Sequence, residues 1–294
     1  MYRALADAIR DAEASGTTLA RVALAAESRD QGRPESEIRS ALARALEIMR
    51  GAVKQGMTGE LRSASGLVGG DAAKLRTGPA GPLADTLFRD VLARALAVQE
   101  VNAAMGVIVA APTAGGAGVL PAVLLGIAHG KGIGDEALID ALVTAGLIGA
   151  VVAERASLSG AEGGCQAETG AAAGMAAGAA TEMLGGSPSQ VGHAVALAQQ
   201  GTLGLVCDPL GGLVELPCVF RNATGAAIAL AAVEMAMAGV TFAIPADEVI
   251  DTMGEIGRSM DVRYRETAGG GLAATPTGRR LARERLVQIK RSDR

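Results

Sequence analysis

The chain of 294 residues is hydrophobic at 49% of its positions and charged at 20%, with 41 glycines, no tryptophan and only 2% aromatic residues. This composition argues against a β-sandwich, in which aromatic and β-branched residues are enriched, and favours closely packed helices. The net charge is −4, and the basic residues are spread along the chain apart from a modest C-terminal cluster, so no nucleic-acid partner is expected.

The N-terminal region is expected to be helical. Its first residues, MYRALADAIRDAEASG, contain no apolar segment before a cleavage site, so no secretory signal is visible and we expect a cytoplasmic protein. Residues 1–57 alternate apolar and charged positions at helical spacing around a polar stretch at 29–34, which predicts a hairpin of two helices. Residues 58–294 are expected to form the main helical domain, continuous with this hairpin.

The segment 58–82 is rich in glycine and serine and contains SGLVGGDAAKL, which predicts a long irregular connection with a function. Beyond it the pattern is helical and apolar in segments separated by glycine-rich breaks: 83–109, 119–129, 135–157, 165–184, 188–203, 217–239, 246–258 and a last basic helix at 276–290. Asp135 and Ser187-Pro188 are typical of helix starts.

The later helices have almost no charge on any face, as in TGAAAGMAAGAA. Such helices are surrounded by protein. We therefore predict an all-α fold in which one or two central apolar helices are wrapped by the others. Residues 101–130 also lack Asp, Glu, Lys and Arg, but prolines and glycines interrupt them, so two buried elements joined by a loop are expected and no membrane span.

The only three cysteines, Cys165, Cys207 and Cys218, lie near glycine or proline at expected loop–helix junctions, where backbone N–H groups are free to bond to sulfur. A buried structural cysteine is the alternative for each one taken alone. A disulfide is not expected of three cysteines in the cytoplasm. Zinc is a second alternative, although no CxxC pair is present. Three thiolates without a fourth suit a [4Fe–4S] cluster in which one iron keeps an open position for a substrate.

The loop AAPTAGGAGVLPAV precedes a helix and contains Thr113, Gly115, Gly116 and Gly118. Free N–H groups at a helix start attract an anion, and glycine lets a ligand approach the backbone, so a substrate carboxylate or a phosphate would fit there. A close helix–helix turn that needs small residues would have the same composition.

Two side chains are candidates for a catalytic base. Lys74 lies in the segment GGDAAKL and could instead form a Schiff base with pyridoxal phosphate, although the alternating strands and helices of a pyridoxal fold are missing. His193 lies in an apolar helix, where a core or interface histidine is the alternative.

Three segments, VNAAMGVIVAAPTAGGAGVLPAVL, GCQAETGAAAGMAAGAATEMLGG and LGLVCDPLGGLVELPCVFRNATGA, resemble the α chain of bacterial iron–sulfur-dependent L-serine dehydratase, also called L-serine ammonia-lyase. The resemblance continues upstream through SGLVGGDAAKL and downstream through FAIPADEVIDTM. It implies a helical catalytic domain and a [4Fe–4S] cluster held by Cys165, Cys207 and Cys218. It also implies a regulatory β part, in many members a separate polypeptide, so we expect a separate β chain as partner.

The resemblance further implies the reaction. An open iron would bind the serine β-hydroxyl, a base would remove the α-proton, and loss of water would lead to pyruvate and ammonia. Thr113 and the loop glycines would hold the substrate carboxylate. Arg221 and Asn222, just past the third cysteine, could point at the same pocket.

Several questions stay open at this level. The base could be Lys74, His193 or a residue of the β chain. A related lyase that releases sulfide from cysteine would have the same three thiolates, and a metal-binding subunit without an active site is a further alternative.

Overall fold

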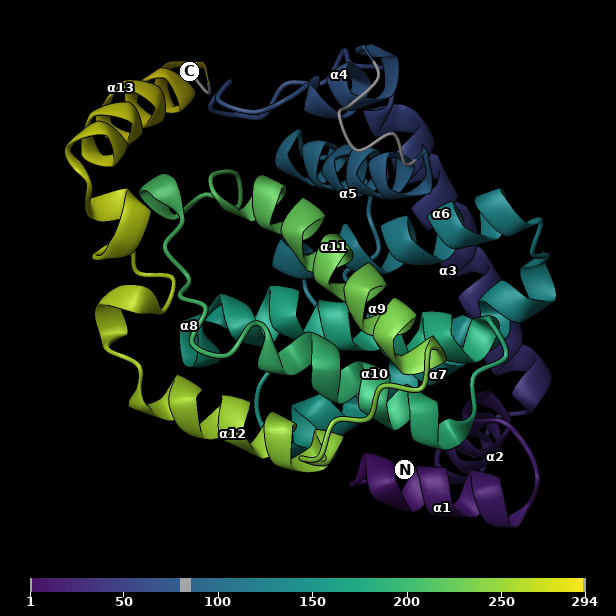
Figure 1. The fold of residues 1–294 in the computed structure, drawn as a ribbon. Coiled ribbons are helices and arrows are strands. Elements are labelled where there is room, and N and C mark those ends of the chain that lie inside the picture. Colours follow the sequence, from purple (N-terminus) through teal and green to yellow (C-terminus); the bar gives the residue numbers. More distant parts are fainter. Residues whose placement is uncertain (1, 80–85, 293–294) are drawn as a thin grey trace.

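The computed structural model describes residues 2–79 and 86–292, and the described residues form helices and loops with no β-sheet (Figure 1). The all-α prediction is therefore confirmed. The α-helices are α1 (Leu5–Ala14), α2 (Leu19–Gln31), α3 (Glu35–Gly56), α4 (Asp71–Thr77), α5 (Thr86–Ala103), α6 (Val119–Lys131), α7 (Asp135–Arg155), α8 (Gly160–Gly163), α9 (Ala171–Met183), α10 (Pro188–Gln200), α11 (Cys218–Met237), α12 (Ala246–Ser259) and α13 (Pro276–Ser292).

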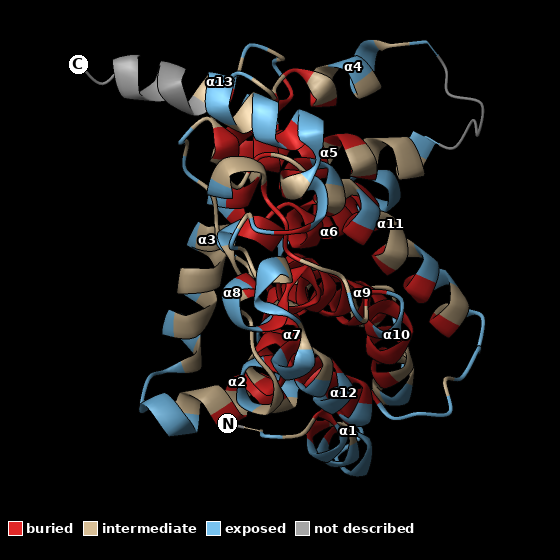
Figure 2. Cartoon of the chain, turned by 90° about the vertical axis from the view of Figure 1, so that its left-hand side faces the viewer, coloured by how far each residue is buried: buried red, intermediate tan, exposed pale blue. Residues whose placement is uncertain are grey.

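Helix α9 lies at the centre of the molecule, as the apolar sequence predicts. Its residues from 171 to 181 are all buried, and it packs against α6, α7, α10 and α11 (Figure 2). Small side chains make this close packing possible. A Cβ atom added to Gly178 would lie 2.4 Å from a methyl carbon of Ile148 and 2.9 Å from one of Val195. A larger residue would therefore push α7 and α10 away from α9.

The N-terminal region differs from the predicted hairpin of residues 1–57, because its described residues, 2–57, contain three helices. The polar stretch does form one break, where Gly32 adopts a positive φ of 64° and ends α2. A second break separates α1 from α2, and there the side chain of Thr18 accepts a hydrogen bond from the N–H of Arg21. The division into a hairpin and a main domain stays a prediction.

The segment 58–82 is not wholly irregular either, because it contains the short helix α4. The carboxylate of Glu100, in α5, accepts hydrogen bonds from the N–H groups of Gly70, Asp71 and Ala72 at 2.9, 2.6 and 3.1 Å. These are the orphan donors at the start of α4. Their partner is distant in sequence, so the local pattern does not reveal this helix.

Two helices, α7 and α11, are long and apolar enough to cross a membrane by length and composition. In the structure α7 packs against α9 and α2, and α11 packs against α5, α9 and α10. Much of their apolar surface therefore has partners within this chain. The uncharged segment 101–130 forms the end of α5, a loop and most of α6, as predicted.

Candidate functional site

The three cysteines come from three different segments, and all are buried, with exposed fractions of 2%, 1% and 3%. Cys165 directly precedes a short π-helical segment, η2 (Gln166–Gly170), which continues into α9. Cys218 is the first residue of α11. Cys207 lies in an extended segment whose backbone pairs with residues 264–266, because its N–H donates to Tyr264 O and its carbonyl accepts from Glu266 N–H, both at 2.8 Å.

The thiols are close enough to affect one another. A hydrogen bond between Cys165 and Cys207 lowers the pKa of Cys165 to about 6, helped by Thr169, whose Oγ1 lies 3.3 Å from its Sγ, and by the positive charge of Arg221. The same interaction raises the pKa of Cys207. Burial, together with the charge of Cys165, raises the pKa of Cys218 to about 12. The site therefore favours one thiolate and would need a cation to hold three.

These thiols are all free, and no disulfide joins them. Among the residues that the structure describes, no group of three or more His, Cys, Asp or Glu side chains is arranged to hold a single metal ion. The zinc alternative, which needs several ligands around one ion, gains no support from this arrangement.

Glu168 is a candidate site residue that the sequence analysis missed. It lies in η2 and is only 9% exposed. Its Oε1 accepts a hydrogen bond from Thr113 Oγ1 at 2.7 Å, and its Oε2 lies 3.9 Å from Cys207 Sγ. Burial raises the pKa of this carboxyl to about 7. A signal was present in the sequence, because Glu168 is the only acidic residue between Cys165 and Glu182, in an otherwise uncharged segment.

The predicted substrate loop lies against η2. A Cβ atom on Gly115 would be 2.7 Å from Glu168 Oε1, and one on Gly116 would be 2.8 Å from the carbonyl oxygen of Glu168. The contact with η2 therefore requires glycine at both positions. Thr113, two residues earlier, reaches the same carboxylate with its hydroxyl. The structure thus brings this loop and the segment of Cys165 together.

Asn222 links the loop to the third cysteine. Its side chain is fully buried, with Oδ1 accepting from Gly118 N–H at 2.9 Å and Nδ2 donating to Gly115 O at 2.7 Å and to Cys218 O at 2.9 Å. Both donors of the amide are thus used by backbone groups. Asn222 therefore fixes the distance between the loop and α11.

Arg221 makes a similar link to the segment of Cys207. Its Nη2 lies 2.7 Å from Asp208 Oδ1, and its Nη1 donates to Val206 O at 2.8 Å. Its positive charge helps to lower the pKa of Cys165 and partly offsets the rise in the pKa of Cys218. Arg221 therefore joins α11 to the extended segment and contributes positive charge beside the sulfur atoms.

The two candidate bases lie elsewhere. The side chain of Lys74 is 76% exposed and pairs with Asp71 in its own helix at 2.7 Å. His193 Nδ1 accepts from Phe242 N–H at 3.3 Å, beside a separate cavity of about 220 Å³. Among the described residues, neither side chain forms a hydrogen bond or ion pair with the cysteines, Glu168 or the loop. Their catalytic role stays a prediction without structural support.

A different residue connects the segment SGLVGGDAAKL to the site. Ser65 donates its backbone N–H to Glu215 Oε1 at 3.1 Å, and its hydroxyl donates to Glu215 Oε2. Glu215 is 4% exposed and lies three residues before Cys218. The glycine-rich connection is thereby anchored beside the third cysteine.

Known proteins with similar sequences identify the family of this chain. The family model "Serine dehydratase alpha chain" matches residues 14–273. The chain is 46% identical to the probable L-serine dehydratase, alpha chain, of Bacillus subtilis, over 97% of this chain and 95% of that protein. It is 41% identical to the L-serine dehydratase, alpha chain, of Peptoniphilus asaccharolyticus, over 86% of this chain and 88% of that protein. An L-serine dehydratase of Escherichia coli is 47% identical over 61% of this chain and 40% of that protein. The chain therefore belongs to the serine dehydratase alpha chain family.

Proposed function

We propose that this chain is the α chain of an L-serine dehydratase and contains the site where water is eliminated from L-serine to give pyruvate and ammonia. The observation that carries this proposal is that three buried thiols lie close to Glu168 and to the loop of Thr113. These groups come from four segments of the chain and share one buried region. Similarity to proteins named as L-serine dehydratases supports the choice of substrate.

The donor set fits a [4Fe–4S] cluster. Cys165, Cys207 and Cys218 are free, buried and close enough to shift one another's pKa values, and Arg221 adds positive charge beside them. A cluster would take one cysteine on each of three irons, so the three sulfurs need not surround a single ion. When bound, the cluster supplies a Lewis acid for the hydroxyl group that leaves.

The chain's own residues would bind and orient the substrate. The N–H groups of Gly116 and Gly118 already donate to Thr113 O and Asn222 Oδ1. The hydroxyl of Thr113 likewise already donates its one proton to Glu168 Oε1. The predicted carboxylate site therefore narrows to the backbone near Gly115, which would hold the serine carboxylate and orient its Cα–H bond.

Glu168 is our candidate for the group that accepts the α-proton. Its carboxylate is hydrogen-bonded to Thr113 and lies beside Cys207, between the proposed carboxylate site and the cysteines. A base must be within hydrogen-bond reach of the proton it removes, and Lys74 and His193 lack any such link to the site. The choice of Glu168 rests on this position.

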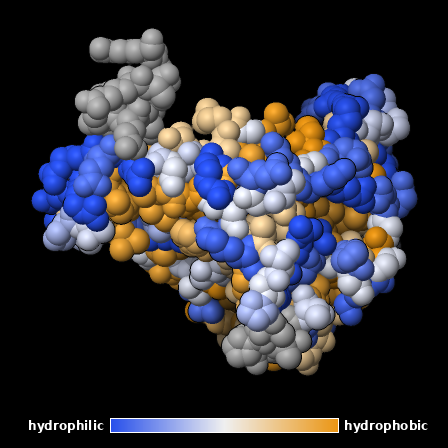
Figure 3. All heavy atoms as spheres, turned by 90° about the horizontal axis from the view of Figure 1, so that it is seen from above, coloured by the Kyte–Doolittle hydropathy of each residue, from blue (hydrophilic) through white to orange (hydrophobic). Residues whose placement is uncertain are grey.

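We further propose a separate β chain as partner. The matched region is only 40% of the related protein from Escherichia coli, which thus has additional sequence. Apolar surface is exposed in several places between charged regions on the face seen in Figure 3. Among the side chains that the structure describes, the most exposed large apolar ones are Met105 at 86% and Val107 at 73%, in the loop that leads to Thr113. Apolar surface of this kind is typical of a contact with another chain.

The test is anaerobic reconstitution with iron and sulfide in the presence of a β chain from a related enzyme. We expect pyruvate formation from L-serine that decays in air and returns with ferrous iron and thiol. Pyruvate from L-cysteine with release of sulfide would favour the related lyase instead. Activity that survives aeration, with pyridoxal phosphate bound, would contradict the proposal.

Variants separate the roles of the residues. Replacing any one cysteine by serine should remove most of the iron and nearly all activity, and the three losses should not add. Glu168→Gln should lower kcat by about 10²- to 10⁴-fold while iron is retained. Glu182→Gln is the matched control, because Glu182 is another carboxylate, partly buried and with a raised pKa, but pairs with Thr144 and the start of α2. An equal loss of kcat in both variants would argue against Glu168 as the base.

A further inference from the structure

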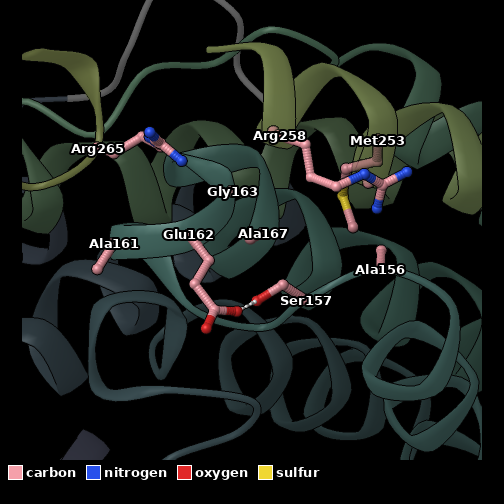
Figure 4. Close-up of a pocket in the computed structure, with 11 residues that line it drawn as sticks. Ala156, Ser157, Ala161, Glu162, Gly163, Ala167, Met253, Arg258 and Arg265 are labelled. Atoms are coloured by element: carbon pink, nitrogen blue, oxygen red, sulfur yellow. Dashed lines mark hydrogen bonds between the residues drawn. The ribbon is translucent and has the colours of Figure 1, made fainter. Parts of the chain in front are cut away.

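A cavity of about 310 Å³ lies beside the cysteine site, although none of the three cysteines lines it (Figure 4). Its walls come from the two residues that follow α7, from α8, from η2 and α12, and from Arg265. This volume is at the lower end of the range for small-molecule sites, about 300–1,000 Å³. The cavity is therefore suited to a small ligand.

One turn of helix, α8, separates this cavity from the cysteine site. A Cβ atom on Gly160 would lie 2.6 Å from Glu168 Oε2 and 3.1 Å from Cys207 Sγ. The next three residues, 161–163, line the cavity. The segment of Arg265 also touches both places, since its neighbours at 264 and 266 pair with the backbone of Cys207. A ligand in the cavity would thus contact two elements that contact the site.

The cavity wall is charged. Arg258 and Arg265 contribute two guanidinium groups, and neither forms an ion pair within 4.0 Å with the residues that the structure describes. The Nε of Arg265 is buried and has no hydrogen-bond partner there. A buried donor without a partner costs free energy, so this atom indicates a missing acceptor.

One carboxylate accompanies the two cations. Glu162 also lines the cavity, and in Figure 4 its carboxylate points toward Ser157, whose Oγ donates a hydrogen bond to it at 2.6 Å. The cavity wall thus contains both cationic donors and an anionic acceptor. This is the pattern that a zwitterion needs.

We propose that this cavity binds a small α-amino acid, with its carboxylate on Arg265, its ammonium group on Glu162, and further positive charge in the wall from Arg258. The choice of L-serine as this amino acid rests on the proposed dehydratase function. The existence of the site does not, because it is argued from the cavity and its charged lining alone. Bound there, the amino acid is one helical turn from the cysteines and stabilises both α8 and the segment paired with Cys207. The cavity is then a second amino-acid site beside the proposed reaction site.

The test is equilibrium binding to the full chain in the absence of turnover, measured by isothermal titration calorimetry. The probes are L-serine, pyruvate, which lacks the ammonium group, and ethanolamine, which lacks the carboxylate. L-serine should bind saturably and more tightly than either. Arg265→Gln and Arg258→Gln should each weaken L-serine binding about tenfold. Glu162→Gln should weaken the binding of L-serine but leave the affinity for pyruvate unchanged.

Two variants control for binding elsewhere. Arg44→Gln removes an exposed arginine that does not line the cavity, and Cys218→Ser alters the cysteine site. Both should leave the affinity unchanged. Binding that is lost in Cys218→Ser but kept in Arg258→Gln and Arg265→Gln overturns the inference, as does equal binding of ethanolamine or no saturable binding of L-serine.

These measurements are separate from the proposed reaction. Because no pyruvate is formed in them, their failure leaves the dehydratase proposal standing. Failure of that proposal would show instead as a lack of pyruvate formation by the reconstituted enzyme. Far-UV circular dichroism of each variant identifies a loss of fold, and Arg258, which is exposed, provides a variant without a buried side chain.

Discussion

Replacement of Asn222 by alanine should destabilise the protein strongly. The change removes three hydrogen bonds and leaves Gly118 N–H and Gly115 O without their partner in a buried region. An unsatisfied buried donor or acceptor costs about 1–3 kcal/mol, so the two together should lower the free energy of unfolding by about 2–6 kcal/mol. This is a large part of a typical total of about 5–15 kcal/mol.

The assay is urea unfolding followed by far-UV circular dichroism. Thr224→Ala is the matched control, because Thr224 is exposed on the same helix, and its unfolding free energy should change by less than about 0.5 kcal/mol. Asn222→Asp keeps the acceptor for Gly118 but turns a second oxygen toward two carbonyl groups, so it should be at least as destabilising at neutral pH. A loss below about 1 kcal/mol in Asn222→Ala would refute the view that Asn222 holds the loop to α11.

Three further predictions follow from single contacts. Gly160→Val should abolish pyruvate formation while far-UV circular dichroism stays unchanged, because the new side chain would meet Glu168 and Cys207; unchanged turnover would contradict that packing. Burial raises the pKa of Glu182, so its contribution to stability is present below the unfolded pKa and lost as pH rises through the higher folded pKa. Urea unfolding from about pH 4 upward should therefore show a weaker pH dependence in Glu182→Gln than in the unmodified chain. Glu100→Ala removes the acceptor of three N–H groups at the start of α4, two of them on the buried residues Gly70 and Ala72, and should lower the unfolding free energy by about 2–6 kcal/mol; a change near zero in urea titration would argue against it.

Local signals in the sequence account for much of the fold. The helix that starts at Pro188 was predicted from Ser187-Pro188, and the structure has a capping box there between Ser187 and Gln190. The apolar run of α9 predicted a central helix, and it is buried throughout its first eleven residues. Helix α4 was missed because its cap comes from α5, and such a tertiary partner leaves no local pattern.

The candidate site was predictable only in part. The cysteines and the loop of Thr113 stood out by composition and by resemblance, and the structure brings their segments together. Glu168 did not stand out, because its partner Thr113 is 55 positions away and the contact exists only in the folded chain. Lys74 drew attention through its glycine-rich surroundings, but its side chain points to solvent, where sequence pattern gives no information.

The burial of α9 has a mechanical consequence for the site. Helix α9 is wedged between α7 and α10 by side chains no larger than methionine, and η2 continues directly into it. The C-terminal end of η2 is thereby held in place. A movement of Glu168 toward a ligand would require the helices packed around α9 to move as well. Strain created at the site is therefore expected to relax in the other direction, through residues 157–164. That segment is therefore expected to be more flexible than the core helices, and its amide hydrogens should exchange faster than those of α9.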